Sequence, residues 1–157
     1  MSVEVNNESA VAADLERVNA LGRHILAKLY VHPETDVSII LLDEEPMSAL
    51  HVEWMDLEGP TDVMSFPMDE LRPGVPGSPT QAGMLGDIVI CPQVATLQAQ
   101  AQGHSVEDEI LLLTTHGMLH LLGFDHAEPE EKEIMFSLQR QLLEDFLGRP
   151  APRETMD

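Results

Sequence analysis

The first third of the chain alternates short apolar runs with segments of helical spacing. Residues 2–7 place apolar side chains at every second position, which predicts a strand. In residues 12–30 the apolar side chains recur every three or four positions, as on one face of a helix. The apolar, β-branched run 36–43 predicts a buried strand, and residues 45–56 predict a second helix.

The middle of the chain predicts two more strands, joined by a long loop. Residues 61–67, TDVMSFP, and residues 86–92, GDIVICP, are short and apolar, with turn-forming residues close by. Between them, residues 68–83 contain three prolines and several glycines, so we expect a loop there. A loop of this length in a compact domain is typical of a segment that lines a site.

The second half of the chain predicts helices only, at residues 92–102, 105–122 and 129–147. Taken together, the order of elements predicts an α+β fold, with a small mixed β-sheet and helices packed on it. We expect a single domain over residues 1–147. Residues 148–157 show no periodicity and predict a loose C-terminal tail.

The composition fits one ordinary cytoplasmic domain. The chain has 157 residues, of which 43% are hydrophobic, enough for one core. It has no apolar run long enough to span a membrane, and its first residues lack the features of a secretion signal. Cys91 is the single cysteine, which excludes an intrachain disulfide, and we interpret it as a small buried hydrophobic residue.

The charge balance argues against broad, charge-driven binding to nucleic acid. Eight Lys and Arg stand against 28 Asp and Glu, which gives a formal net charge of −20. Such a field repels polyanions, although a local basic spot or docking through a basic protein remains compatible with it. The eight basic residues form no dense run, so we expect weak binding to free RNA with a shallow salt dependence.

Three histidines give the strongest chemical signal. They lie in the stretch TTHGMLHLLGFDHAE, at His116, His120 and His126. On a helix, His116 and His120 share one face, and Gly123 stands where a helix commonly ends and the chain can turn back. Three imidazoles would hold one Zn²⁺ per chain and leave a fourth position for water, the arrangement of a catalytic zinc site. The alternative is that they are core histidines satisfied by protein acceptors.

The residue after the first histidine limits which hydrolase this could be. The H-x-x-x-H-x-x-G-x-x-H frame is that of metzincin proteases, which carry Glu directly after the first histidine as the general base. Here that position is Gly117, which has no group to accept a proton. The sequence is therefore compatible with a zinc-dependent hydrolase, but it argues against a protease of the usual mechanism.

The motifs HGMLHLLGFDH, GPTDVMSFP and LGDIVICP, in this arrangement along the chain, resemble the YbeY family of bacterial rRNA maturation factors. The resemblance covers roughly residues 36–147. It implies a zinc-dependent, single-strand-specific endoribonuclease acting in maturation of the 3′ end of small-subunit ribosomal RNA and in ribosome quality control. It also implies that the family's three metal ligands fall on His116, His120 and His126, and that the partners are a ribosomal RNA precursor and the small ribosomal subunit.

One position departs from the family pattern. Many members carry an arginine shortly before the PTDV segment, a residue assigned to nuclease activity, whereas this chain has Met55. Methionine cannot pair with a phosphate. The nearest basic candidate is Arg72 in the long loop, which would act only if the loop folds over the metal. Its alternative is a surface arginine that balances Asp69 and Glu70.

Asp125 keeps two interpretations and the overall function keeps three. Asp125 precedes His126 and either orients a ligand imidazole or forms the turn after Gly123. Besides the nuclease, the sequence allows a non-catalytic ribosome-assembly protein in which zinc orders the fold, and a metal hydrolase of another substrate. For RNA targeting we expect docking through a basic ribosomal protein or assembly factor.

Overall fold

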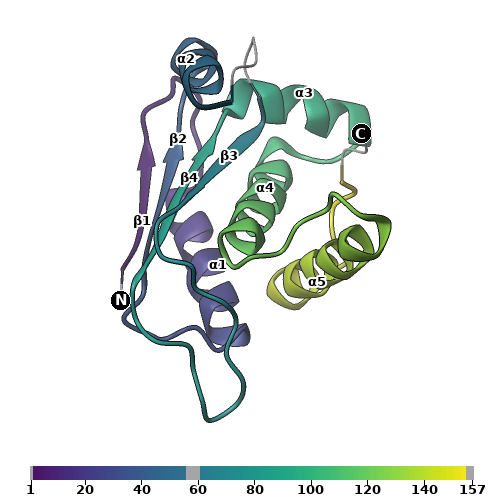
Figure 1. Ribbon diagram of the computed structural model, residues 1–157. Helices are drawn as coiled ribbons and strands as arrows, with labels where there is room; N and C mark the ends of the chain where they lie inside the picture. Colours follow the sequence, from purple (N-terminus) through teal and green to yellow (C-terminus); the bar gives the residue numbers. More distant parts are fainter. Residues whose placement is uncertain (1, 56–60, 155–157) are drawn as a thin grey trace.

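The computed structural model describes residues 2–55 and 61–154, without the side chains of Ser2 and Met55. Strands and helices alternate at first and helices alone follow, as the sequence predicts (Figure 1). The elements are β1 (Ser2–Asn7), α1 (Leu15–Lys28), β2 (Asp36–Leu41), α2 (Glu44–Met55), β3 (Val63–Pro67), β4 (Met84–Ile90), α3 (Pro92–Gln102), α4 (Val106–Leu121) and α5 (Pro129–Leu147). The predicted α+β class with a mixed sheet is confirmed.

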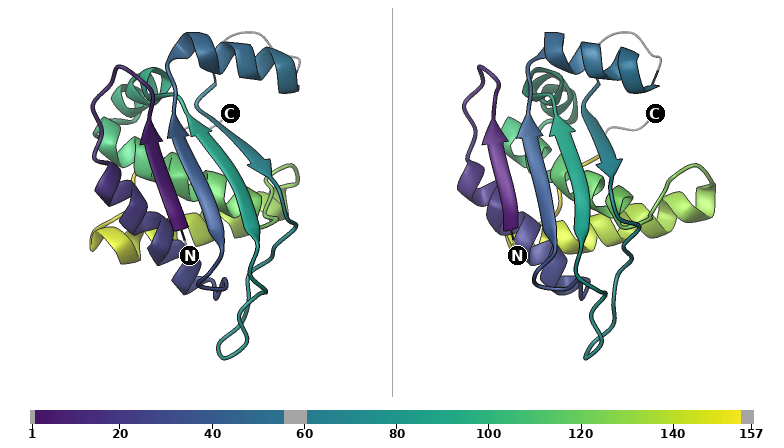
Figure 2. Two further views of the ribbon diagram at one scale, coloured as in Figure 1. Left: turned by 90° about the vertical axis from the view of Figure 1, so that its left-hand side faces the viewer. Right: turned by 60° about the vertical axis from the view of Figure 1, so that its left-hand side comes forward.

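The four strands lie in the order β1-β2-β4-β3. The first three are parallel, and β3 runs antiparallel to β4, from the pair Val63–Ile90 to the pair Pro67–Gly86. In this order β3 is an edge strand. Helices α1, α4 and α5 cover one face of the sheet, and α2 lies across the upper end of the strands (Figure 2). This arrangement leaves one side of β3 turned toward α4 and α5.

Helix α4 is the centre of the domain. Eleven of its sixteen residues are buried, because it packs against α1, α3 and α5 as well as against β3 and β4. Its start is capped by Ser105, whose hydroxyl accepts from the backbone N–H of Asp108 at 3.1 Å. At Gly117 the helix lies directly on β4, since a Cβ there would be 2.8 Å from Cγ2 of Ile88. The side chains of α4 are therefore held firmly by the core.

A second, smaller apolar cluster lies on the opposite face of the sheet. Its buried members are Met47, Met64, Val89 and Cys91. The burial of Cys91 agrees with the interpretation of this residue as a small hydrophobic side chain. In the part of the chain that the structure describes, no helix combines the length and apolar character needed to cross a bilayer.

The segment after α5 has no helix or strand through Glu154, and polar contacts hold both ends of this described stretch. The loose tail expected over residues 148–157 stays a prediction. Arg149 donates two hydrogen bonds to the carboxylate of Asp108, at 3.0 and 2.8 Å, and Glu154 lies 2.9 Å from Nε of Arg140. These partners come from other parts of the chain, so local periodicity could not reveal them. The domain boundary at residue 147 stays a prediction.

Candidate metal centre and its cleft

The three predicted histidines meet at the end of α4. His116 and His120 are one turn apart, with their Nε2 atoms 3.1 Å from each other. After α4 the chain turns back at Gly123, which has a φ of 96°, a conformation that glycine adopts without strain. This turn brings the ring of His126 to 5.1 Å, centroid to centroid, from each of the other two. One ligand nitrogen from each ring lies within 4.8 Å of the others.

This geometry fits a metal ion better than it fits satisfied core histidines. Tetrahedral coordination at about 2.0–2.1 Å places two ligand nitrogens about 3.3 Å apart, close to the 3.1 Å between His116 and His120. The pKa of His120 is lowered to about 4, mainly by burial and secondly by the charges of His116 and His126. The His120 imidazole is therefore neutral at pH 7, the form that binds a metal. The three histidines could hold one ion.

Helix α5 supplies the wall next to the histidines. The ring of Phe136 lies 5.9 Å from that of His116 and 5.8 Å from that of His126. One turn further along, Oε1 of Gln139 is 3.0 Å from Nδ1 of His116. The side chain of Gln139 is only 1% exposed. Sequence reasoning missed both residues, since only the packing of α5 on α4 reveals them.

The histidines line one end of a cleft of about 430 Å³. Residues 63–65 and Pro67 of the edge strand β3, together with Asp62 just before it, form one wall, and α4 and α5 form the other. The opposite end carries three carboxylates, those of Asp62, Glu109 and Glu154. Among the residues described as lining the cleft, none is Lys or Arg. The cleft thus has a histidine end and an acidic end.

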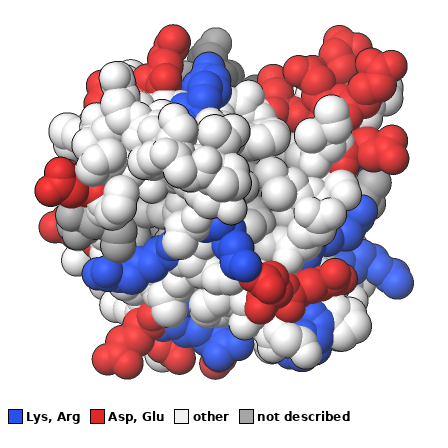
Figure 3. All heavy atoms as spheres, turned by 90° about the horizontal axis from the view of Figure 1, so that it is seen from below, with Lys and Arg blue, Asp and Glu red and all other residues white. Residues whose placement is uncertain are grey.

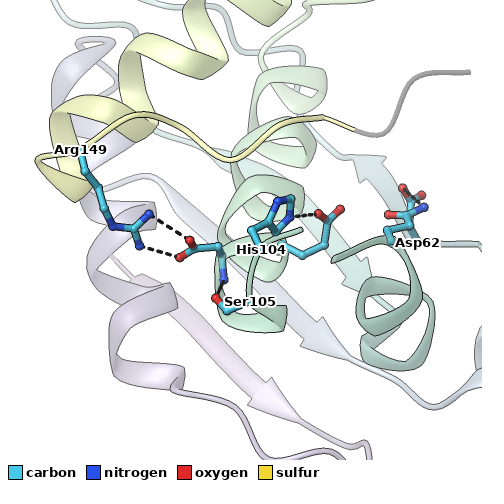
Figure 4. Close-up of polar contacts among 7 residues, drawn as sticks. Asp62, His104, Ser105 and Arg149 are labelled. Carbon is cyan, nitrogen blue, oxygen red and sulfur yellow. Dashed lines mark hydrogen bonds and ion pairs between the residues drawn. The ribbon is translucent and has the colours of Figure 1, made fainter. Parts of the chain in front are cut away.

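Separate polar contacts hold two of the carboxylates of the acidic end, one beside His104 and one at Asp62 (Figure 4). Glu109 is 1% exposed, and one of its carboxylate oxygens lies 2.5 Å from Nε2 of His104. Burial raises the pKa of Glu109, while the hydrogen bond and charge of His104 oppose the rise and Asp62 adds to it. Asp62 in turn accepts from the amide of Gln98 at 3.2 Å. No motif singles out His104, which is an isolated histidine in the sequence.

A protein-family model described as Endoribonuclease YbeY matches residues 3–147. The chain belongs to the YbeY family. A relative named Endoribonuclease YbeY from Renibacterium salmoninarum is 66% identical over 155 residues, which cover 99% of each protein. One of the same name from Thermobifida fusca is 63% identical over 143 residues, 91% of this chain and 92% of its own length. The solution structure of TM1509 from Thermotoga maritima aligns with a TM-score of 0.66 at 26% identity, over 94% of this chain and 90% of TM1509.

Met55 replaces the arginine of many YbeY proteins, and Arg72 is the nearest basic residue that could take its place. Met55 is the last residue of α2, and its side chain lies outside the described part of the chain, as do residues 56–60. The long loop does fold against the turn between His120 and His126, since a Cβ on Gly123 would be 2.5 Å from Nε of Arg72. Arg72 itself is exposed, donates to the carbonyl of Leu71 at 3.0 Å, and is not among the residues that line the cleft.

Asp125 has the geometry of a turn residue in this YbeY chain. Its carboxylate accepts from the backbone N–H of His126 at 2.7 Å, and the residue is exposed. Its charge still acts on the site, because it opposes the lowering of the His120 pKa. The hydrogen bond holds the turn that presents His126, so its influence on a metal would be indirect.

Proposed function

We propose that this chain is a zinc-dependent endoribonuclease that cuts single-stranded RNA during maturation of the 3′ end of small-subunit ribosomal RNA, with a role in ribosome quality control. The observation that carries the proposal is the convergence of His116, His120 and His126 at one end of a cleft. Membership of the YbeY family supports the reaction and the substrate class. As metal ligands we propose these three histidines, with one zinc ion per chain.

Bound zinc would supply Lewis acidity toward a phosphoryl oxygen and would lower the pKa of a bound water. The chain's own residues supply the rest. The three imidazoles would hold the ion, and Phe136 packs against the rings of His116 and His126 on the α5 side. Glu109 is two helical turns from His116, about 10.5 Å along the axis. That distance places its carboxylate away from the ligand nitrogens.

The dimensions of the cleft favour a single strand as substrate. A volume of about 430 Å³ is in the range of small-ligand sites and is too small for a duplex. A single strand can splay one nucleotide into such a space, whereas paired and stacked bases cannot enter it. Lys132 adds a positive charge near the histidine end, with Nζ 5.4 Å from the ring centre of Phe136. Its ammonium group is placed to meet a backbone phosphate.

Targeting by a basic partner would compensate for the acidic surface. Three of the eight Lys and Arg are already in ion pairs, namely Lys28, Arg140 and Arg149. On the face seen from below, Lys and Arg side chains are interspersed with acidic ones (Figure 3). We therefore propose docking on the small subunit through a basic ribosomal protein or assembly factor. The cytoplasmic location expected from the sequence stays a prediction.

The decisive experiment combines metal analysis with RNA cleavage. Purified wild-type protein is expected to carry about one zinc per chain and to cut a single-stranded fragment of ribosomal RNA, but not a duplex. His116→Ala and added chelator should both abolish cleavage. His32→Ala, which changes a histidine outside the cleft, serves as the matched control and should cut normally. Cleavage that survives both chelator and His116→Ala would refute the proposal.

Affinity for the same RNA across a salt series tests the docking proposal. The salt slope of single-strand binding is about −0.7 per phosphate contacted. One or two contacts near Lys132 would give a slope of about −1, with weak binding. A slope near −5 would require a basic groove and would contradict docking as the main source of targeting.

A second function is favoured by one observation, the three carboxylates that line the cleft. They repel a phosphate backbone and suit a non-catalytic assembly protein in which zinc orders the fold. In that case the wild-type protein carries zinc, binds the small subunit and leaves RNA intact. A metal hydrolase acting on another substrate would likewise leave RNA intact, but it would not bind the subunit.

A further inference from the structure

Gln139 stands out among the residues around the histidines because it is buried and polar, and it is not one of the three proposed metal ligands. It lies on α5, and its amide oxygen is 3.0 Å from Nδ1 of His116. Since 1% of the residue is exposed, it is almost wholly withdrawn from water. A buried amide oxygen at this distance from a ring nitrogen is a fixed hydrogen-bond acceptor.

The hydrogen bond determines which nitrogen of His116 is available. A neutral imidazole carries one N–H, and the other nitrogen has the free lone pair. The Nε2 atom of His116 faces Nε2 of His120 at 3.1 Å, so Nε2 is the atom directed toward the candidate metal position. If Nε2 has the lone pair, the proton is on Nδ1, and the group opposite Nδ1 must accept it. The oxygen of Gln139 meets this requirement.

Two contacts from α5 also fix the plane of the His116 ring. Phe136 meets this ring edge-on, at an interplanar angle of 72°, while Gln139, three residues along the same helix, holds Nδ1. Residues three apart on a helix lie on one face, so both contacts arise from one packed surface. His116 therefore reaches the metal position without a free choice of rotamer or tautomer.

We infer that Gln139 is a positioning residue of the metal centre, which holds His116 in the tautomer and orientation that present Nε2 to the metal. The inference rests on the proposed metal site. Outer-shell partners of ligand histidines typically change metal affinity by about 10 to 100-fold when they are removed. Gln139 acts only through His116, and we assign it no contact with the RNA.

The test compares zinc affinity in three variants of the full-length protein. Gln139→Met keeps the length of the side chain and removes the acceptor, and it should weaken zinc binding about 10 to 100-fold. Gln139→Glu restores an acceptor and should recover wild-type affinity or exceed it. Gln141→Met, at an exposed position on the same helix, is the matched control and should bind zinc as the wild type does. Competition with a chromophoric chelator gives the dissociation constants, and melting of the metal-free proteins checks the fold.

An NMR measurement on the zinc-loaded wild-type protein tests the inference without any substitution at residue 139. Long-range nitrogen–proton correlations should show His116 with its proton on Nδ1, exchanging slowly with water. Coordination of zinc through Nδ1 of His116 would overturn the inference even if Gln139→Met failed to fold. So would equal zinc affinity in Gln139→Met and Gln141→Met. Absence of zinc binding in the wild type would instead refute the proposed metal site.

Discussion

The two ends of the cleft use the same side chain in opposite ways. At the histidine end, imidazole faces imidazole, so that lone pairs converge on a position that a cation can fill. At the acidic end, the imidazole of His104 faces the carboxylate of Glu109, and the two satisfy each other. The comparison teaches that a buried histidine is a candidate ligand only when its neighbour leaves it a lone pair. The following experiments test this difference.

The largest effect is expected on metal content. Replacing His120 and His126 by Ala should remove the bound metal entirely, because one imidazole cannot hold it. His104→Ala should leave about one metal ion per chain, although it also removes a buried imidazole. Elemental analysis of the purified proteins decides between the two ends. Loss of metal in His104→Ala would show that the acidic end contributes to the same site.

The next effect is on stability at the acidic end. His104→Ala leaves Glu109 buried without its partner, which should lower the free energy of unfolding by about 3 kcal/mol in urea titrations. The double variant His104→Ala, Glu109→Leu should regain most of this loss.

Since burial raises the folded-state pKa of Glu109 above 4.5, the protonated form stabilises the fold below pH 4.5, and this contribution is lost as the pH rises through the folded-state pKa. The His104→Ala variant should therefore recover stability toward pH 4.5.

The histidine end should respond to pH with the opposite sign. In the metal-free protein the pKa of His120 is lowered from 6.5 to about 4, so the unfolded chain binds the proton more readily. The stability contributed by neutral His120 is present above pH 6.5 and is lost as the pH falls toward 4. The change is about 3 kcal/mol at most. Urea titrations of wild type and His120→Ala between pH 7 and 4 measure it, and equal pH dependence in both would contradict the assignment.

The smallest effect is expected where the C-terminal segment meets the start of α4. Arg149→Ala removes two hydrogen bonds to Asp108, but half of the Arg149 side chain is exposed. The loss of stability should therefore be small. Thermal melting against Arg153→Ala, an exposed arginine near the end of the same segment, gives the comparison. A large drop in melting temperature in Arg149→Ala alone would contradict this expectation.

The sequence predicted the histidine end because its geometry is local. His116, His120 and the turn at Gly123 lie within one helix and its end, so spacing alone brings the three imidazoles together. The helices and strands of the described residues were also predicted, since periodicity, apolar runs and turn residues mark them locally. The acidic end was missed, because its members come from the start of β3, from α4 and from the C-terminal segment. Only the tertiary fold places Asp62, Glu109 and Glu154 around one space.

Gln139 is a second example of a residue whose role cannot be predicted from local sequence. Its position on α5 follows the helical repeat, but nothing in the repeat distinguishes a glutamine that holds a ligand from one that faces solvent, such as Gln141. The difference depends on the angle at which α5 packs on α4. The contacts of Arg149 and Glu154 escape a local analysis for the same reason, because their partners lie on distant elements.

The close contact between Gly117 and Ile88 has a consequence for the evolution of this scaffold. Any side chain at residue 117 would need the side chain of Ile88 on β4 to shift, since a Cβ already comes within 2.8 Å of its Cγ2. This is the position at which the similar protease frame carries its glutamate. A glutamate at residue 117 would therefore require repacking around Ile88 before it could be accommodated. The two chemistries are thus separated by packing, and a lineage could pass between them only after a second change had made room behind the helix.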